Sequence, residues 1–239
     1  MNRLGAAVVI GTLLTVLVPV TAAEAAPERG RSGAAACTAD TGPYQWQLER
    51  YLGRKADGRQ SVADCEAIRR FQAKHEVRPA NGYANLWTYR MMLVAQAGKN
   101  PNKAGKCPVR RFKVVCVDMN RQLLWVQRGR KVLFGPVPMR TGRDGRETRR
   151  GWHRIYMKRK IFFSSLYNNA PMPYSQFFDR GQALHGTPHD LYNGGGSAGC
   201  VNLRLPDAKR LWTLLKVRNW VYVWGTKPGT VRGDRADLG

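Results

Sequence analysis

The stretch His185-Gly-Thr-Pro-His-Asp-Leu-Tyr-Asn-Gly-Gly-Gly-Ser-Ala-Gly-Cys-Val-Asn-Leu-Arg-Leu205 pairs a histidine with a cysteine, Cys200, fifteen residues later, across a run of three glycines. A thiol is a weak nucleophile until it loses its proton, and a nearby imidazole is a common acceptor for that proton. Short apolar runs flank the loop, so the pattern predicts a rigid frame that holds both groups at one site. A disulfide or a metal site would use similar residues. Because no closely spaced second thiolate is present, zinc is the weaker interpretation and no metal is expected.

The first 25 residues have the pattern of a secretory signal peptide. Met1 to Arg3 is a short basic start, Leu4 to Val20 carries no charge, and Ala23 and Ala25 offer small residues for cleavage. An uncleaved membrane anchor is the alternative, although the apolar length only marginally suffices for it. No other stretch is apolar enough to span a membrane. The mature protein is therefore expected to be secreted, with no stable membrane span after processing.

Export makes the five cysteines informative, because disulfides persist outside the cytoplasm. Four cysteines can pair in three ways and leave one over. The sequence-local pairs are Cys37 with Cys65 and Cys107 with Cys116, and this pairing leaves Cys200 as a candidate reactive thiol. Connectivity cannot be read from spacing alone, so the other pairings stay open.

The net charge of +24 is concentrated in the second part of the chain. Residues 37–98 hold nine basic and six acidic residues, whereas residues 99–239 hold 28 basic and eight acidic residues, a net charge of +20. Such a surface attracts polyanions. For an exported protein we expect anionic cell-wall polymers as partners rather than nucleic acid, because no nucleic-acid-binding motif is present. The alternative is that the basic runs are solvated faces.

Residues 37–98 have helical spacing, after a flexible tail at 26–36. Apolar residues recur at helical intervals over Tyr44–Leu52, in a segment that opens at Ser61, and over Leu86–Val94. Ser61 is a candidate N-terminal cap for the second of these. The pattern predicts a small all-α domain of three helices around one core.

Beyond a linker at 99–106 the period changes from helical to alternating, which predicts a mainly-β domain over 107–228 and a tail at 229–239. Helical spacing returns only at 206–215, where Pro206 and Asp207 suit a helix start. The expected strands are 112–117, 122–127, 131–137, 152–157 and 220–224, with further apolar runs at 161–167 and 183–184.

The helical part resembles the small peptidoglycan-binding domain that accompanies cell-wall enzymes. The resemblance rests on Ala67-Ile-Arg-Arg-Phe-Gln72, on Asn81-Gly82, and on Leu86-Trp87-Thr88, although the family's usual order of the last pair is Thr-Trp. A purely structural three-helix module is the alternative.

The second part, about 113–225, resembles the L,D-transpeptidases of the YkuD type. Five segments carry the likeness: 117–126, Thr141-Gly142 with 151–155, Met172-Pro173-Tyr174, His185-Gly186, and Ser197 to Asn202. The resemblance implies a β-sandwich with one late helix. It also implies a cysteine enzyme, without cofactor, that cross-links peptidoglycan stem peptides, and hence a protein associated with the cell wall. We expect a monomer.

The resemblance and the residue chemistry together assign the candidate site. Cys200 is the expected nucleophile, His185 the general base, Gly186 the residue whose carbonyl orients the imidazole, and Gly199 a backbone oxyanion donor. The candidate substrate-binding residues are Tyr174, Ser197, Asn202 and Arg204.

One position departs from the family pattern. The histidine that usually precedes Gly-Cys is Ala198 here, and His189 is a candidate to fill the vacated space. Three other functions therefore stay open. The first is a cell-wall-binding protein with impaired catalysis. The second is an L,D-carboxypeptidase, which hydrolyses instead of transferring. The third is a binder of nucleic acid or membrane, which the export signal disfavours.

Overall fold

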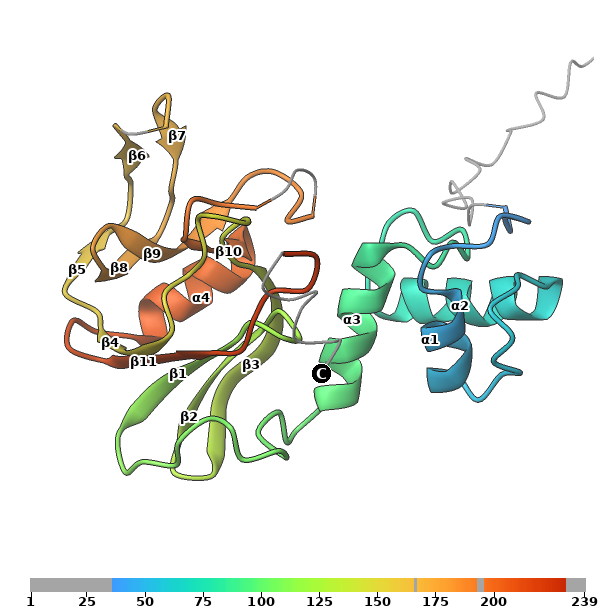
Figure 1. Cartoon of the computed structure of the whole chain (residues 1–239), viewed down its shortest axis with the longest axis horizontal. Coiled ribbons are helices and arrows are strands. Elements are labelled where there is room, and N and C mark those ends of the chain that lie inside the picture. Colours follow the sequence, from blue (N-terminus) through green and yellow to red (C-terminus); the bar gives the residue numbers. More distant parts are fainter. Residues whose placement is uncertain (1–35, 166, 193–195, 231–239) are drawn as a thin grey trace, which may run out of the picture. The chain divides into compact units, whose positions relative to one another are not determined.

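The computed structural model describes residues 36–165, 167–192 and 196–230 (Figure 1). The predicted signal peptide, most of the first tail and most of the second lie outside the described residues. The described residues belong to one compact unit. None of their helices is both long and apolar enough to cross a membrane.

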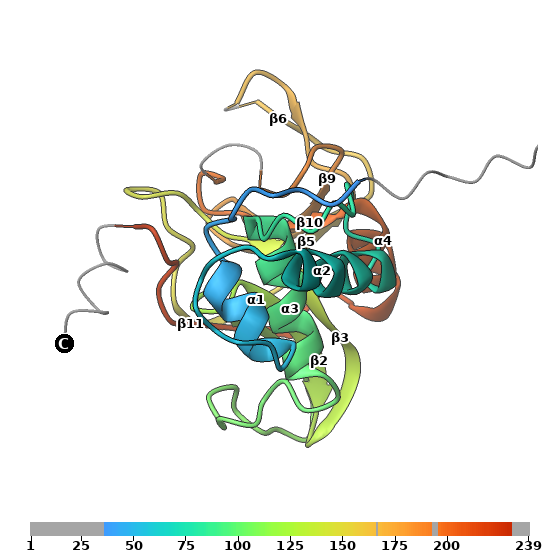
Figure 2. The same cartoon turned by 90° about the vertical axis from the view of Figure 1, so that its right-hand side faces the viewer.

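Three helices come first: α1 (Gln45–Tyr51), α2 (Val62–Lys74) and α3 (Leu86–Ala97). Side chains cap two of them, because Ser61 Oγ accepts the Asp64 N–H and Asn85 Oδ1 accepts the Thr88 N–H. The three helices lie close together (Figure 2), and their buried apolar side chains form one shared core. Its buried members are Leu48, Ile68, Phe71, Val77, Ala84, Met91 and Met92.

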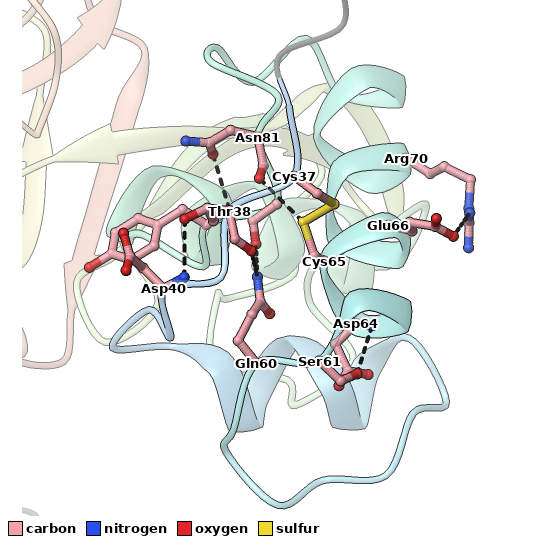
Figure 3. Close-up of a disulfide and its surroundings, with 12 residues drawn as sticks. Cys37, Thr38, Asp40, Gln60, Ser61, Asp64, Cys65, Glu66, Arg70 and Asn81 are labelled. Carbon is pink, nitrogen blue, oxygen red and sulfur yellow. Dashed lines mark hydrogen bonds and ion pairs between the residues drawn. A yellow bond between two sulfur atoms is a disulfide. The ribbon is translucent and has the colours of Figure 1, made fainter.

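A disulfide between Cys37 and Cys65 ties the segment before α1 to helix α2 (Figure 3). Around it, Thr38 N donates to Asn81 O at 3.0 Å, and Gln60 Nε2 donates to Thr38 O at 3.3 Å. The cross-link and these bonds fix the first described residues onto the α2–α3 connection.

Nine of the described strands form one mixed sheet in the order β4-β11-β1-β2-β3-β10-β9-β8-β5, and β6 and β7 form a separate hairpin. Within the sheet β1 pairs in parallel with β11, and β9 with β10. The strands are β1 (Lys113–Asp118), β2 (Leu123–Arg128), β3 (Lys131–Arg140), β4 (Gly151–Arg154), β5 (Met157–Arg159), β6 (Phe163–Ser164), β7 (Ala170–Pro171), β8 (Ser175–Asp179), β9 (Gln182–Thr187), β10 (Val201–Arg204) and β11 (Trp220–Trp224).

The sheet curls until its two edges meet. Strands β4 and β5 stand at opposite ends of the strand order, yet only Ile155 and Tyr156 separate them in sequence. Ile155 is fully buried in the main core, and the Tyr156 N–H donates to Phe177 O on β8. The predicted β-sandwich is therefore right only in being mainly β, because the hydrogen bonding runs continuously through nine strands instead of dividing into two sheets.

Helix α4 (Leu205–Leu214) covers the inner face of the curl and lies against β9 and β10 (Figure 1). Ala208 and Leu211 on α4 are buried together with Leu184 on β9 and Leu203 on β10. The late helix that the sequence predicts is present within one residue of its expected bounds.

The observed strands differ from the expected ones in detail. The run 152–157 divides into β4 and β5, because Ile155 turns inward at the meeting edges of the sheet. Within the apolar run 161–167, the described residues form strand only at the two residues of β6. Strands β8 and β10 are not expected from the sequence. The residues of β8 are buried on both faces and lack the alternation that marks a half-buried strand, whereas β10 alternates but has only four residues.

Candidate active site

The parallel pairing of β9 with β10 brings the two ends of the His185–Leu205 stretch together. Asn202 on β10 lies opposite His185 on β9, and Cys200 directly precedes β10. Parallel neighbours need a long crossover connection, and here the crossover contains the glycine-rich loop. His185 and Cys200 consequently line one cleft of about 820 Å³.

His185 is held in a defined orientation. Its Nδ1 lies 2.7 Å from the carbonyl oxygen of Gly186, so Nδ1 carries the hydrogen and Nε2 keeps a free lone pair. The side chain is 6% exposed, and this burial lowers its pKa to about 4, with a further lowering by the positive charge of Arg140. The imidazole is therefore neutral at pH 7, which is the state that a general base requires.

Helix α4 explains why a glycine follows His185. A Cβ at Gly186 would lie 3.1 Å from Leu205 Cδ1 and 3.2 Å from Ala208 Cβ. The absent side chain lets α4 approach β9 closely, and the Gly186 N–H donates to Pro173 O at 2.8 Å. The Met172-Pro173-Tyr174 segment is thereby joined to the histidine strand.

Cys200 is the free cysteine among the described residues, because Cys37 pairs with Cys65 and Cys107 with Cys116. Its Sγ lies 3.9 Å from the carbonyl oxygen of Gly181. Burial raises the pKa of the thiol, and a hydrogen bond from the backbone of Ala183 acts in the opposite direction. Within the described ranges, no three His, Cys, Asp or Glu side chains gather as a metal-binding group.

The turn before Cys200 requires glycine at position 199. Gly199 has a φ of +107°, and a Cβ there would lie 2.1 Å from Gln182 Nε2. Ser197 closes the turn, because its Oγ donates to Cys200 O at 2.5 Å and accepts the Gly199 N–H at 3.2 Å. The Gly199 N–H, expected as an oxyanion donor, is thus engaged by Ser197.

Two buried polar side chains fasten the 141–150 loop, Thr148 to the cysteine turn and Gln182 to β9. Thr148 Oγ1 donates to Gly199 O at 2.9 Å and accepts the Gly142 N–H at 3.1 Å. Gln182 Nε2 donates to Glu147 O at 3.0 Å, and its Oε1 accepts the Arg149 N–H at 3.0 Å. Thr148 and Gln182 are 2% and 5% exposed, so water cannot readily replace these bonds.

The cleft is strongly cationic. A single acidic residue, Glu147, lines its described part. One of the arginines, Arg149, forms an ion pair with Asp179. Apolar side chains such as Phe162, Met172 and Phe177 line another part of it. The lining arginines are Arg140, Arg143, Arg146, Arg149 and Arg180.

The four candidate substrate-binding residues divide between two places. Ser197 and Asn202 line the cleft, and Asn202 Oδ1 is buried without a hydrogen-bond partner. Tyr174 and Arg204 lie outside it. Tyr174 lines a separate apolar pocket and its ring contacts Trp212, while Arg204 Nε binds Asp207 Oδ2 at 2.6 Å at the start of α4.

Sequence reasoning misses Thr148, Gln182 and the lining arginines. The arginines of 141–150 lie in a segment whose sequence indicates only a charged loop. No sequence pattern marks Gln182, because its role depends on contacts with Glu147 and Gly199, which are distant in sequence. Ala198 and His189 both line the cleft.

The comparisons with known proteins agree with this geometry. The family model for the YkuD L,D-transpeptidase catalytic domain matches residues 112–223. A solved L,D-transpeptidase (Yku) from Stackebrandtia nassauensis is 37% identical, with a TM-score of 0.60, and the match covers 82% of this chain and 100% of that one. The chain belongs to the YkuD family of L,D-transpeptidases. The match to the Stackebrandtia nassauensis structure covers more of this chain than the family model does. The structural similarity therefore includes part of the helical stretch.

Two further solved L,D-transpeptidases are more distant. The enzyme from Xylanimonas cellulosilytica (residues 123–326) is 23% identical with a TM-score of 0.45, and the match covers 80% of this chain and 97% of that one. The enzyme from Mycobacterium tuberculosis H37Rv is 19% identical with a TM-score of 0.44, covering 47% and 57%. No curated protein matches the chain.

Protonation of His185 should make this enzyme less stable in mild acid. The folded state holds the pKa near 4, whereas the unfolded chain binds a proton near 6.5, so stability is lost as the pH falls below 6.5. Between pH 7 and pH 5 the free energy of unfolding should fall by about 2 kcal/mol more in the wild type than in His185→Gln. Urea unfolding measures this difference. His189→Gln, at an exposed position, is the control, and equal pH slopes in wild type and His185→Gln would contradict the account.

Removal of the Thr148 hydroxyl should loosen the cysteine turn. Thr148→Val keeps the shape but leaves Gly199 O and the Gly142 N–H without a partner, which should cost about 2 kcal/mol of stability. Thr148→Ser retains the hydroxyl and should recover most of the loss. Urea unfolding, together with the rate of Cys200 alkylation, measures the effect. If the valine and serine variants behaved alike, the bonds of Thr148 would not hold the turn.

Proposed function

We propose that this protein is an exported cysteine transpeptidase that acylates on a peptidoglycan stem peptide and transfers the acyl group to an acceptor amine. One observation carries the proposal. The Nδ1 of His185 is bound by Gly186 O, which leaves Nε2 free in the same cleft as the free thiol of Cys200. A neutral base and an unpaired thiol in one cleft are the minimum requirement for cysteine acyl transfer.

The proposed reaction has two halves. His185 Nε2 takes the Cys200 proton, and Sγ attacks the carbonyl carbon between an L-centre and the terminal D-residue. The C–N bond breaks, the departing amine receives the proton from His185, and a thioester remains. The acceptor amine then attacks the thioester, its proton passes through His185 to the sulfur, and the thiol is restored. The proton transfer requires Sγ and Nε2 to face each other, so Sγ is proposed to leave its contact with Gly181 O, at 3.9 Å, before the proton moves.

The tetrahedral intermediate needs donors for its oxyanion. Gly199 and Cys200 are the proposed backbone donors. Ser197 Oγ accepts the Gly199 N–H, so this N–H would have to leave Ser197 to bind the oxyanion. We therefore propose the Cys200 N–H as the main oxyanion donor. Ser197 then acts on the loop, whereas the buried Asn202 Oδ1 is available to an N–H of the peptide.

The helices before the catalytic domain are proposed to bind peptidoglycan. We place this domain at residues 37–98 and the catalytic domain at 107–228, joined by a linker at 99–106. The motif around Phe71-Gln72 supports the assignment, because Gln72 is buried and ties α2 to the turn before α3 through the Gly82 N–H and Tyr83 O. In the catalytic domain, the three basic runs at 110–111, 149–150 and 158–160 are proposed to bind anionic wall polymers.

Export and a cell-wall location are part of the proposal. Two disulfides support it, since such bonds persist in oxidising compartments outside the cytoplasm. The predicted signal peptide at 1–25 supplies the route.

A turnover assay should separate transfer, hydrolysis and binding without turnover. With a stem tetrapeptide and an acceptor amine, we expect mass spectrometry to detect a cross-linked product and one free terminal D-residue per cross-link. Cys200→Ala should lower this rate about a thousandfold or more while the melting temperature stays near that of the wild type. Release of the D-residue without a cross-link would assign an L,D-carboxypeptidase, and no release would favour a wall-binding protein with a lost activity.

A further inference from the structure

The turn between β8 and β9 contains an arginine in an unusual conformation. Asp179 pairs with Gln182 across the turn, and the two residues between them, Arg180 and Gly181, have φ of +38° and +87°. Positive φ at both central residues is typical of a type I′ turn, which favours Asn, Asp or Gly at the first position. Arginine carries a backbone cost there, and such cost is common where a side chain has a functional task.

Other side chains hold this turn in place. The Gly181 N–H donates to Tyr156 Oη at 3.2 Å. Arg149 Nη2 donates to Asp179 O at 3.1 Å and to Arg180 O at 3.5 Å, and Arg149 Nε pairs with the Asp179 carboxylate. The backbone of Arg180 is therefore fixed at one point on the edge of the cleft.

The turn adjoins the nucleophile. The carbonyl oxygen of Gly181, the neighbour of Arg180, lies 3.9 Å from Cys200 Sγ. Arg180 is exposed and lines the same cleft as Cys200. Among the described residues no carboxylate forms a salt bridge with Arg180, since Asp179 pairs with Arg149 instead. Arg180 thus lines the cleft next to the residue whose carbonyl contacts Cys200 Sγ, and its charge is available to a ligand.

We propose that Arg180 binds the terminal carboxylate of the donor stem peptide and so makes the enzyme selective for donors with a free C-terminus. The inference rests on the proposed acyl transfer at Cys200. In a donor that loses its terminal residue, the nearest negative charge to the scissile carbonyl is that residue's own carboxylate, separated from it only by the amide nitrogen and one Cα. A guanidinium binds a carboxylate through two parallel hydrogen bonds, which gives direction as well as charge.

This contact acts in the first half-reaction only. The carboxylate departs with the expelled residue, so Arg180 contributes to formation of the thioester and not to its resolution by the acceptor amine. Departure also clears the place beside the thioester for the incoming amine. A donor that ends in a carboxamide lacks the charge and cannot form this contact with Arg180.

The test compares two donors that differ only at the C-terminus, a stem tetrapeptide acid and its carboxamide. The measured quantity is kcat/KM for release of the terminal residue by the full mature chain. We expect the wild type to prefer the acid by about tenfold or more, the size of one charged hydrogen-bonded pair. Arg180→Asn should lose this preference, because its rate should fall by more with the acid than with the carboxamide. Asparagine tolerates positive φ, so the turn should be kept.

Arg218→Asn is the matched control. Arg218 is also an exposed arginine with positive φ, at +74°, but it does not line the cleft, so this variant should keep the wild-type preference. Equal rates of the wild type on acid and carboxamide, or a preference retained in Arg180→Asn, would overturn the inference and leave the proposed function standing. Failure of the wild type to process either donor would overturn both.

Discussion

The parallel pairing of β9 with β10 is the constraint on which the site depends. It sets His185 opposite Asn202 and therefore places Cys200 at the same end of the two strands. Parallel strands cannot be joined by a tight turn, so the chain between them must leave the sheet and return. The glycine-rich stretch occupies this crossover. The close approach of α4 to Gly186 and the bonds of Thr148 to the Gly199 turn hold its two ends.

Burial gives this site a neutral resting state. It lowers the pKa of His185 and raises that of Cys200, so both shifts disfavour an ion pair before substrate binds. In the proposed mechanism the thiolate forms as the proton moves to Nε2, in a cleft whose lining arginines favour negative charge. The Gly186 carbonyl contributes by fixing the tautomer, because without it either ring nitrogen could carry the hydrogen. The arrangement therefore favours a neutral thiol and a neutral imidazole at rest over a preformed thiolate–imidazolium pair.

The sequence predicts what depends on local pattern, and fails where distant contacts decide. Helix α2 follows from the Ser61 cap and its apolar spacing, and Cys200 is left free once the other four cysteines form their sequence-local pairs. The continuous sheet does not follow, because Ile155 joins two edges that only the complete strand order brings together. Arg204 does not line the cleft, because its guanidinium binds Asp207 at the start of α4. The local sequence is compatible with either position of this side chain.

The most direct test of Cys200 as the nucleophile is intact mass spectrometry after incubation with a carbapenem, whose β-lactam ring an activated thiol opens. The account predicts one covalent adduct per chain in the wild type and none in Cys200→Ala, with both proteins folded. Since the other four cysteines are paired in disulfides, the adduct should map to Cys200 alone. A wild type that stays unmodified, or an adduct that persists in Cys200→Ala, would contradict the assignment.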